Sequence, residues 1–284
     1  MAKEYDPKTL KAVQTIELEI FEKFIEICEK NHLTYFAFGG TGIGALRHKG
    51  FIPWDDDIDV ALPRKDYEKF LEIAAKEYSD EFYILNAETD SNYPLATTRW
   101  CKKGTTFWEE ALKTVPCKFG VFLDVYAFDD CPKDEKQFKR QAWSTWFWGK
   151  LMILRSLGNP VLPMSGWKAK LITAICTVAH YVLKLFCISP KWLYKNLKKN
   201  AIRYAGSNSG KVAYMCDTNP FTNTLTNDQI YPLRKVPFEH LEINIPNKME
   251  EMLTVTYGDF MQLPPIEKRK NHFPYQLDLG DYEE

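Results

Sequence analysis

The chain has 284 residues, of which 45% are hydrophobic and 26% are charged, and its formal net charge is −1. This composition is typical of a globular protein with a sizeable core, and the length allows one or two domains. The near-zero charge excludes the global basic field of many nucleic-acid-binding proteins, so we expect no nucleic-acid partner.

The cysteines and the first residues indicate the compartment. The seven cysteines are odd in number and none is in a C-x-x-C pattern, which predicts neither a disulfide framework nor a zinc site. Residues 1–11 are polar and charged and do not resemble a signal peptide. We therefore expect free thiols in a reducing compartment, the cytoplasm.

Helices and strands alternate in the first half of the chain. Apolar residues at a 3.6-residue period predict a helix over residues 9–32. We further expect strands at 35–38, 57–62, 82–85 and 121–128, helices at 42–49 and 66–78, and a hairpin formed by 96–102 and 105–108.

The second half of the chain is predicted to begin with helices. We expect helices at 133–157, 167–186 and 191–204, strands at 211–217, 235–238 and 242–245, a helix at 248–257, and an irregular polar tail from Pro264. The pattern favours an α+β fold, with a mixed β-sheet flanked by helices and a helical insert in the middle of the chain.

Residues 171–188 read LITAICTVAHYVLKLFCI. This apolar stretch is at the short edge for a membrane span, and His180 and Lys184 are costly in lipid. Two interpretations stay open, a buried amphipathic helix and a helix lying at a membrane surface.

Four carboxylates occur within five residues, in the run Asp55-Asp56-Asp57-Ile58-Asp59. In a strand over residues 57–62, Asp57 and Asp59 share one face and lie about 7 Å apart. Two carboxylates at this spacing can hold a hard divalent cation, and Mg²⁺ commonly bridges such carboxylates to substrate phosphates. The competing interpretation is an exposed acidic turn.

A further carboxylate, Asp124, interrupts the apolar strand at 121–128. A buried Asp needs a partner, because leaving it unpaired is costly. A metal shared with Asp57 and Asp59 would supply one. The alternatives are a structural salt bridge or a position at the end of the strand.

The tripeptide Gly39-Gly40-Thr41 separates a predicted strand from a predicted helix. Glycines at such a point let backbone N–H groups approach a phosphate, and a helix N-terminus favours an anion. Because Gly-Gly also makes ordinary turns, this interpretation depends on the acids nearby.

The stretch GGTGIGALRHKGFIPWDDDIDVALPRKDYEKF, residues 39–70, resembles the signature of the LicD family. Shorter similarities lie at residues 120–124, 257–259 and 263–265 and at His272. The family is similar in fold to nucleotidyltransferases and includes phosphocholine transferases and fukutin-type sugar-alcohol phosphate transferases. The 16 residues between Gly40 and Asp57 exceed the link of the general nucleotidyltransferase pattern but match this family.

The resemblance implies a phosphotransferase with a nucleotidyltransferase-like core. Its catalytic and metal-binding residues would be Asp57, Asp59 and Asp124, holding Mg²⁺ or, alternatively, Mn²⁺. Asp124 would be either a metal ligand or the base for the acceptor hydroxyl. The implied reaction transfers phosphocholine from CDP-choline to a cell-surface glycan or its lipid-linked precursor, of the teichoic acid or lipooligosaccharide type, and releases CMP.

Three alternatives stay open. The donor could instead be CDP-ribitol or CDP-glycerol, which would make the chain a polyol-phosphate transferase. A nucleotidyltransferase acting on protein or RNA would release pyrophosphate. A non-catalytic adaptor at a membrane is the third, and the intact set of acids argues against it.

Further side chains near the motifs are candidates for substrate contacts. Basic residues can hold phosphates, and aromatic cages hold quaternary ammonium groups such as choline. The candidates for substrate binding are Gly39, Gly40, Thr41, Arg47, His48, Lys49, Trp54, Arg99, Trp100 and His272, with Tyr93 and Trp108 as further aromatic candidates. For each charged residue, the alternative is a solvated surface position.

We expect three parts along the chain. Residues 1–132 would form the nucleotidyltransferase-like catalytic core, and residues 209–284 a C-terminal part that packs back on it. Residues 133–208 would form a helical insert that contacts the acceptor or a membrane. Such an insert would suit a cytoplasmic enzyme in peripheral contact with the inner face of the cell membrane.

Overall fold

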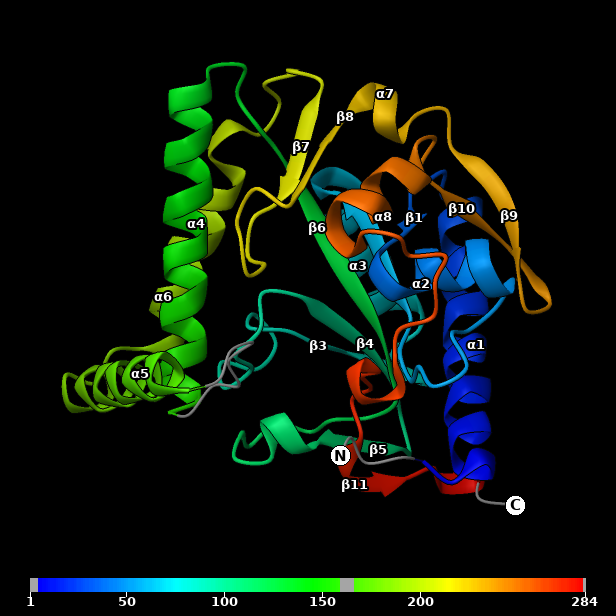
Figure 1. The fold of residues 1–284 in the computed structure, drawn as a ribbon, viewed down its shortest axis with the longest axis horizontal. Helices are drawn as coiled ribbons and strands as arrows, with labels where there is room; N and C mark the ends of the chain where they lie inside the picture. The colour runs from blue at the N-terminus through cyan, green and yellow to red at the C-terminus, as the bar shows by residue number, and fades with distance from the viewer. Residues whose placement is uncertain (1–4, 159–165, 283–284) are drawn as a thin grey trace.

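The computed structural model of the chain describes residues 5–158 and 166–282. A mixed β-sheet lies at its centre, with helices packed against it and a further group of helices to one side (Figure 1). The predicted α+β class is confirmed, and a mixed sheet flanked by helices is the arrangement expected of a nucleotidyltransferase-like fold.

The central sheet is organised by its longest strand, β6. Along the main path the strands are β1 (Phe36–Ala37), β2 (Asp59–Pro63), β6 (Phe122–Asp130), β4 (Thr98–Lys102) and β3 (Phe82–Leu85). The pair β2–β6 is parallel, whereas β6 and β4 are antiparallel. The far end of β6 pairs with β7 (Lys211–Tyr214), which in turn pairs with β8 (Asn223–Thr226).

Two long helices cover one face of this sheet. Helix α1 (Pro7–Lys30) is capped by Asp6, whose side chain accepts hydrogen bonds from the backbone N–H groups of Lys8 and Thr9. It packs on the sheet beside α3 (Arg64–Glu77), where the rings of Phe24 and Phe70 lie 4.9 Å apart between centroids. The apolar period that predicted both helices is the face that each of them buries.

The opposite face of the sheet carries polar groups, because side chains alternate along a strand. Leu123 and Val125 of β6 belong to the main apolar core that includes α1 and α3. Asp124 and Tyr126, one residue along in each case, line a cavity instead. The alternation in β6 therefore separates the core from the polar side of the sheet.

The helical group to one side consists of α4 (Glu135–Ser156), α5 (Trp167–Leu185) and α6 (Pro190–Ala201). Figure 1 shows it on the left, far from α1. Helices α4 and α6 are joined by the buried Gln141, whose amide donates to the carbonyl of Ala201 at 2.7 Å.

Helix α5 is mostly exposed, which does not agree with the interpretation of residues 171–188 as a buried amphipathic helix. His180 is the one residue of this helix that is buried. Among the described residues, no single helix is long and apolar enough to cross a membrane. Taken together, α5 and the segment Pro190–Tyr204 are long and apolar enough to cross a membrane, but the pair is bent by 112°. This statement concerns length and composition alone.

The predicted hairpin of residues 96–102 and 105–108 is wrong. Both edges of β4 are taken by β3 and β6, so β5 (Thr106–Glu109) pairs elsewhere. Its antiparallel partner is β11 (Pro274–Asp278), in the tail that was predicted to be irregular. This pairing holds the C-terminal segment against the rest of the fold.

The other elements connect these parts. They are α2 (Gly39–Ile43), the π-helix η1 (Gly44–His48), η2 (Glu110–Leu112), η3 (Ile202–Tyr204), α7 (Asn227–Ile230), the hairpin of β9 (Arg234–Phe238) and β10 (Leu241–Ile245), α8 (Met249–Tyr257), η4 (Ile266–Lys268) and η5 (Gly280–Tyr282). Short elements such as β8 and α7 were not predicted, because four residues carry too little periodicity.

Candidate metal centre and active site

Three carboxylates come together where β2 begins beside β6. One oxygen each of Asp57, Asp59 and Asp124 lie within 4.8 Å of one another. Asp59 is directly opposite Asp124 in the parallel β2–β6 pair, so the two side chains project from the same face of the sheet. The structure thus brings together the three acids that were predicted as metal ligands.

The convergence does not arise from a strand over residues 57–62. Strand β2 begins at Asp59, so the predicted start at Asp57 is wrong and Asp57 lies in the segment that leads into the strand. This segment is held on both sides. The N–H of Asp124 donates to the carbonyl of Ile58 at 3.0 Å, and the amide of Gln14 donates to the carbonyl of Asp55 at 3.0 Å.

The chemistry of these acids fits a divalent cation. Burial first, and then the charge of Asp57 and Asp124, raises the pKa of Asp59 well above its ordinary value. The Oδ1 atom of Asp59 is buried and has no hydrogen-bond partner within the described residues. An ion with oxygen ligands would partner that atom and offset the repulsion between the carboxylates.

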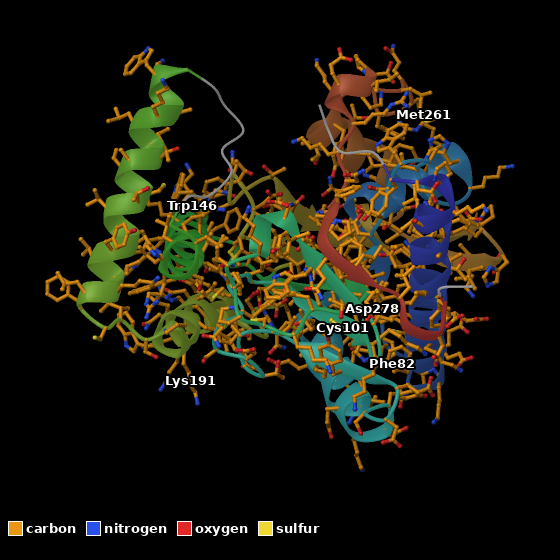
Figure 2. The ribbon with its side chains drawn as sticks, turned by 90° about the horizontal axis from the view of Figure 1, so that it is seen from below. Phe82, Cys101, Trp146, Lys191, Met261 and Asp278 are labelled. Carbon is orange, nitrogen blue, oxygen red and sulfur yellow. The ribbon has the colours of Figure 1, made fainter. Side chains whose placement is uncertain are left out.

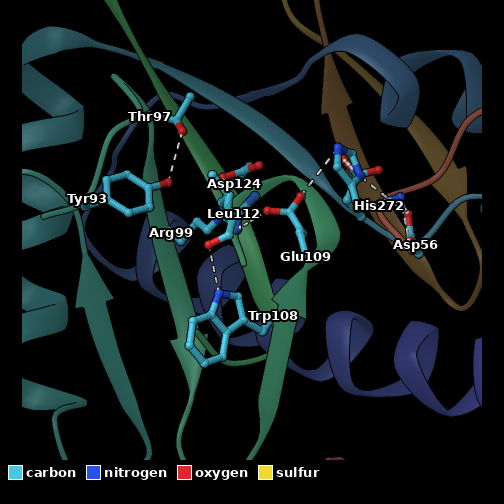
Figure 3. A network of polar contacts seen from close by, with 10 residues as sticks. Asp56, Tyr93, Thr97, Arg99, Trp108, Glu109, Leu112, Asp124 and His272 are labelled. Atoms are coloured by element: carbon cyan, nitrogen blue, oxygen red, sulfur yellow. Dashed lines mark hydrogen bonds and ion pairs between the residues drawn. The ribbon is translucent and has the colours of Figure 1, made fainter. Parts of the chain in front are cut away.

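A buried arginine balances the third acid. Arg99 lies 3.4 Å from Asp124 through Nε and donates to Glu109 at 2.8 Å through Nη1, as Figure 3 shows. Burial raises the pKa of Asp124, Arg99 lowers it and Asp57 raises it, and the resulting pKa is about 6. Arg99 was predicted as a substrate contact. It is 2% exposed, and its guanidinium donates hydrogen bonds to these two carboxylates.

The C-terminal segment adds His272 to the acidic run. Its backbone N–H donates to both oxygens of Asp56, at 2.8 and 3.0 Å, and its Nδ1 lies 3.3 Å from Asp57. Asp56 also accepts a hydrogen bond from the Tyr5 hydroxyl at 2.6 Å and is fully buried. Burial lowers the pKa of His272, but Asp57, Asp56 and Glu109 together raise it well above the ordinary value.

The glycine pair lies directly against carboxylates. A Cβ atom on Gly39 would lie 2.9 Å from Asp59 Oδ2, and one on Gly40 would lie 2.9 Å from Asp55 Oδ2. Gly39 also has a positive φ of 53°. Thr41 completes the turn by accepting the backbone N–H of Asp59 at 2.7 Å. The glycines therefore give the acids room, in addition to the phosphate approach predicted for them.

Of the predicted basic contacts at residues 47–49, Arg47 interacts electrostatically with Asp55 of the acidic run. Arg47 donates to the carbonyl oxygens of Phe260 and Gln262 and to Nε2 of His48, so it holds the C-terminal segment. Lys49 is exposed at the end of η1. None of the three basic residues lines the cavity beside Asp59.

The predicted aromatic contacts are not at the cavity either. Trp100 is fully buried in the apolar core, and Tyr93 is 1% exposed. Trp54 lies under the guanidinium of Arg269, 4.1 Å from ring centroid to Cζ. The indole of Trp108 donates to a backbone carbonyl at 3.0 Å. The structure therefore places no choline cage at these four rings.

A cavity of about 850 Å³ opens beside Asp59 and Asp124. Its polar end also includes Gly39, Arg99 and His272, and its other end is walled by α4 and α5, where the lining residues include Trp146, Lys150, Ile153, Ile172 and Cys176. The helices that follow residue 133 thus form one wall of the space next to the acids.

Sequence reasoning missed several groups in or behind this site. Tyr126 hydrogen-bonds Asp59, and its position two residues after Asp124 was a signal for the same face. Lys150 lines the cavity from α4, and nothing in its local sequence indicates that position.

Glu17 of α1 is a further missed carboxylate. It is 1% exposed, and neither carboxylate oxygen has a hydrogen-bond partner within the described residues. Burial and the charges of Asp57 and Asp56 raise its pKa well above the ordinary value. The signal was its place on the apolar face of the helix, four residues after Val13.

A mixed sheet with three convergent acids beside a large cavity is the architecture of a nucleotidyltransferase-like domain. Residues 32–149 match the family model described as "LicD/FKTN/FKRP, nucleotidyltransferase domain". The lipopolysaccharide cholinephosphotransferase LicD of Haemophilus influenzae is 28% identical over 272 residues, which cover 93% of this chain and 96% of that protein. An uncharacterised protein of Rickettsia typhi is 42% identical over 48 residues, 17% of this chain and 16% of its own length. The chain therefore carries a LicD family nucleotidyltransferase domain over residues 32–149 and is a transferase.

Proposed function

We propose that this chain transfers phosphocholine from CDP-choline to a hydroxyl group of a cell-surface glycan or of its lipid-linked precursor, and releases CMP. One observation carries the proposal. The acids Asp57, Asp59 and Asp124 converge beside a large cavity, in a chain similar along 93% of its length to a lipopolysaccharide cholinephosphotransferase.

Asp57 and Asp59 are the residues that we assign to hold Mg²⁺ or Mn²⁺. When bound, such an ion neutralises phosphate charge and orients the diphosphate of the donor. The assignment follows from charge, because within the described chain neither Asp57 nor Asp59 has a Lys or Arg at salt-bridge distance. Asp57 is paired with His272, and Arg99 acts on it only from further away.

Asp124 differs from the other two acids because Arg99 already balances its charge. With a pKa of about 6 it is ionised near neutral pH. We therefore assign Asp124 to accept the proton of the acceptor hydroxyl, the second of the two roles expected for it.

The choline and phosphate groups of the donor would meet other cavity residues. The ring of Tyr126 lies 4.9 Å from that of Phe38 and 5.0 Å from that of Tyr214, between centroids, and all three residues line the cavity. Such rings can hold a quaternary ammonium. Lys150 and His272 contribute positive charge to the same cavity.

We also propose the division of the chain into a core over residues 1–132, an insert over 133–208 and a C-terminal part over 209–284. The insert supplies the α4 and α5 wall of the cavity, which supports a role for it on the acceptor side. Peripheral contact of this cytoplasmic enzyme with the inner face of the cell membrane would bring a lipid-linked acceptor to that wall.

The test measures CMP release from CDP-choline, CDP-ribitol and CDP-glycerol in the presence of a choline-free glycan acceptor and Mg²⁺. We expect CDP-choline to be the preferred donor. Asp57→Asn and Asp59→Asn should lower turnover at least about 1000-fold, while Asp80→Asn, an exposed carboxylate between α3 and β3, keeps the wild-type rate. Preference for a CDP-polyol refutes the choline donor, and pyrophosphate release refutes the phosphocholine chemistry.

A further inference from the structure

One face of α5 is apolar and has no covering element among the described residues. Its large side chains Leu171, Ile175, Val178, Val182 and Leu185 are between 44% and 78% exposed. They are spaced by three or four residues, so they lie on one side of the helix. In Figure 2 this helix is the outermost element, at the edge opposite α1, with side chains projecting outward.

The other side of α5 packs against the protein. His180 is buried there, and its Nδ1 lies 2.7 Å from the carbonyl oxygen of Leu154 in α4. Ile172 and Cys176 line the cavity from this same side. A different side of α5 therefore makes the contact with the core, and the exposed apolar face is additional to it.

Charge is distributed unevenly around this surface. Of the 37 Lys and Arg residues of the chain, 14 lie within residues 136–216, and none of the 38 Asp and Glu residues does. In the sequence, Lys168 and Lys170 precede Leu171, and Lys191 and Lys195 follow in α6, and all four are exposed. The net charge of −1 conceals this separation of charge along the chain.

Aromatic side chains lie at both ends of the same face. Trp167 is 71% exposed at the start of α5, and Phe186 is 70% exposed directly after its end. A helix with an apolar face, flanking lysines and large aromatic residues is suited to the boundary between lipid headgroups and acyl chains. The excess of positive charge selects anionic headgroups, because each Lys or Arg near the surface adds to the attraction.

We propose that α5 lies in the plane of an anionic bilayer, with Leu171, Val178 and Leu185 entering the acyl boundary and the lysines of α5 and α6 contacting headgroups. The binding itself follows from this surface alone. Its consequence, that a lipid-linked acceptor reaches the cavity wall formed by α4 and α5, rests on the proposed function.

The experiment is co-sedimentation of the full chain with phosphatidylcholine vesicles, with and without phosphatidylglycerol. We expect binding only when phosphatidylglycerol is present, and release by high salt. Val178→Asp combined with Leu185→Asp should weaken binding at least about tenfold, since two inserted apolar groups become charged. Lys168→Glu combined with Lys170→Glu should weaken it as well.

The matched control is Ile266→Asp, which changes an apolar residue of η4 that is 64% exposed. It should bind like the wild type. Equal binding to neutral vesicles, absence of binding, or full binding by the Val178 and Leu185 variant would overturn the proposal. So would light scattering that shows a dimer dissociated by that variant, because a second copy would then cover the face.

The outcome is separable from the transferase assignment. With a water-soluble acceptor, CMP release from CDP-choline should be unchanged in the Val178 and Leu185 variant, because neither residue lines the cavity. A wild-type chain that releases CMP from CDP-choline but does not bind the anionic vesicles would refute the bilayer surface alone. A wild-type chain that binds the vesicles but releases no CMP from CDP-choline would refute the donor chemistry alone.

Discussion

Replacement of Arg99 by Met tests how the third acid of the site is kept ionised. The side chains of Arg99, Glu109 and Asp124 are 3%, 7% and 8% exposed, so the change leaves two buried carboxylates without a cation. The ion-pair distances of 2.8 and 3.4 Å correspond to about 6 and about 5 kcal/mol at an effective dielectric constant of about 20. Part of this attraction is offset because the guanidinium no longer has to be desolvated, and the expected net loss is about 3–5 kcal/mol.

The loss should depend on pH in a defined direction. Without Arg99, the folded-state pKa values of Glu109 and Asp124 lie above their unfolded values of about 4.3 and about 3.9. The folded protein then holds protons that the unfolded chain has released, so stability falls as pH rises above about 4. Urea unfolding of Arg99→Met should therefore show a small loss near pH 5 and the full loss near pH 8.

Catalysis should respond to the same substitution. The pKa of Asp124, about 6 in the wild type, rises when Arg99 is removed, so the acid limb of the pH–rate profile for CMP release moves to higher pH. Arg64→Met is the matched control. It breaks a second ion pair, with Asp129 at 2.7 Å, in which Arg64 is partly buried and Asp129 is buried. It should cost stability and leave the pH–rate limb in place.

Two results would contradict this reasoning. A stability loss below about 1 kcal/mol in Arg99→Met would mean that the pair contributes little. A pH–rate limb that stays in place, while the folded fraction is held constant, would remove Asp124 from proton transfer.

Three further outcomes are expected from the site. Glu17→Gln should raise the free energy of unfolding by about 1–2 kcal/mol near pH 8 and by less near pH 5. The reason is that the pKa of Glu17 is raised in the folded chain, so the wild type keeps a proton that the unfolded chain releases. Calorimetry at both pH values checks this. Gly39→Ala should lower the free energy of unfolding by about 1–3 kcal/mol and reduce the rise in melting temperature on adding Mg²⁺, because the new Cβ would crowd Asp59. Gly104→Ala is the control. Gly104 also has a positive φ but open space around it, so this variant should keep the Mg²⁺ effect. His272→Ala should cost the metal-free protein about 1 kcal/mol below pH 6.5, and the loss should vanish as pH rises through the raised pKa of His272; a loss that persists at alkaline pH would contradict the charge argument.

The elements that sequence patterns predicted well are those whose signal is local. The 3.6-residue period of α1 and the apolar run of β6 are long enough to identify each element without its neighbours. Strand β8 and helix α7 have four residues each and lack such a signal. Trp100, predicted as a substrate contact, lies in the apolar core, because an aromatic residue next to a motif can face the other side of its strand.

The sequence by itself determined the α+β class, the dense acidic run with its glycine pair, and the apolar and basic character of residues 167–199. Only the tertiary structure decided which carboxylates meet. Asp57 faces Asp59 and Asp124 because β2 pairs with β6, and His272 and Glu109 join them because β11 pairs with β5. Strand pairing depends on which edges other strands leave free, and that is a property of the whole fold, whereas period and charge are read from adjacent residues.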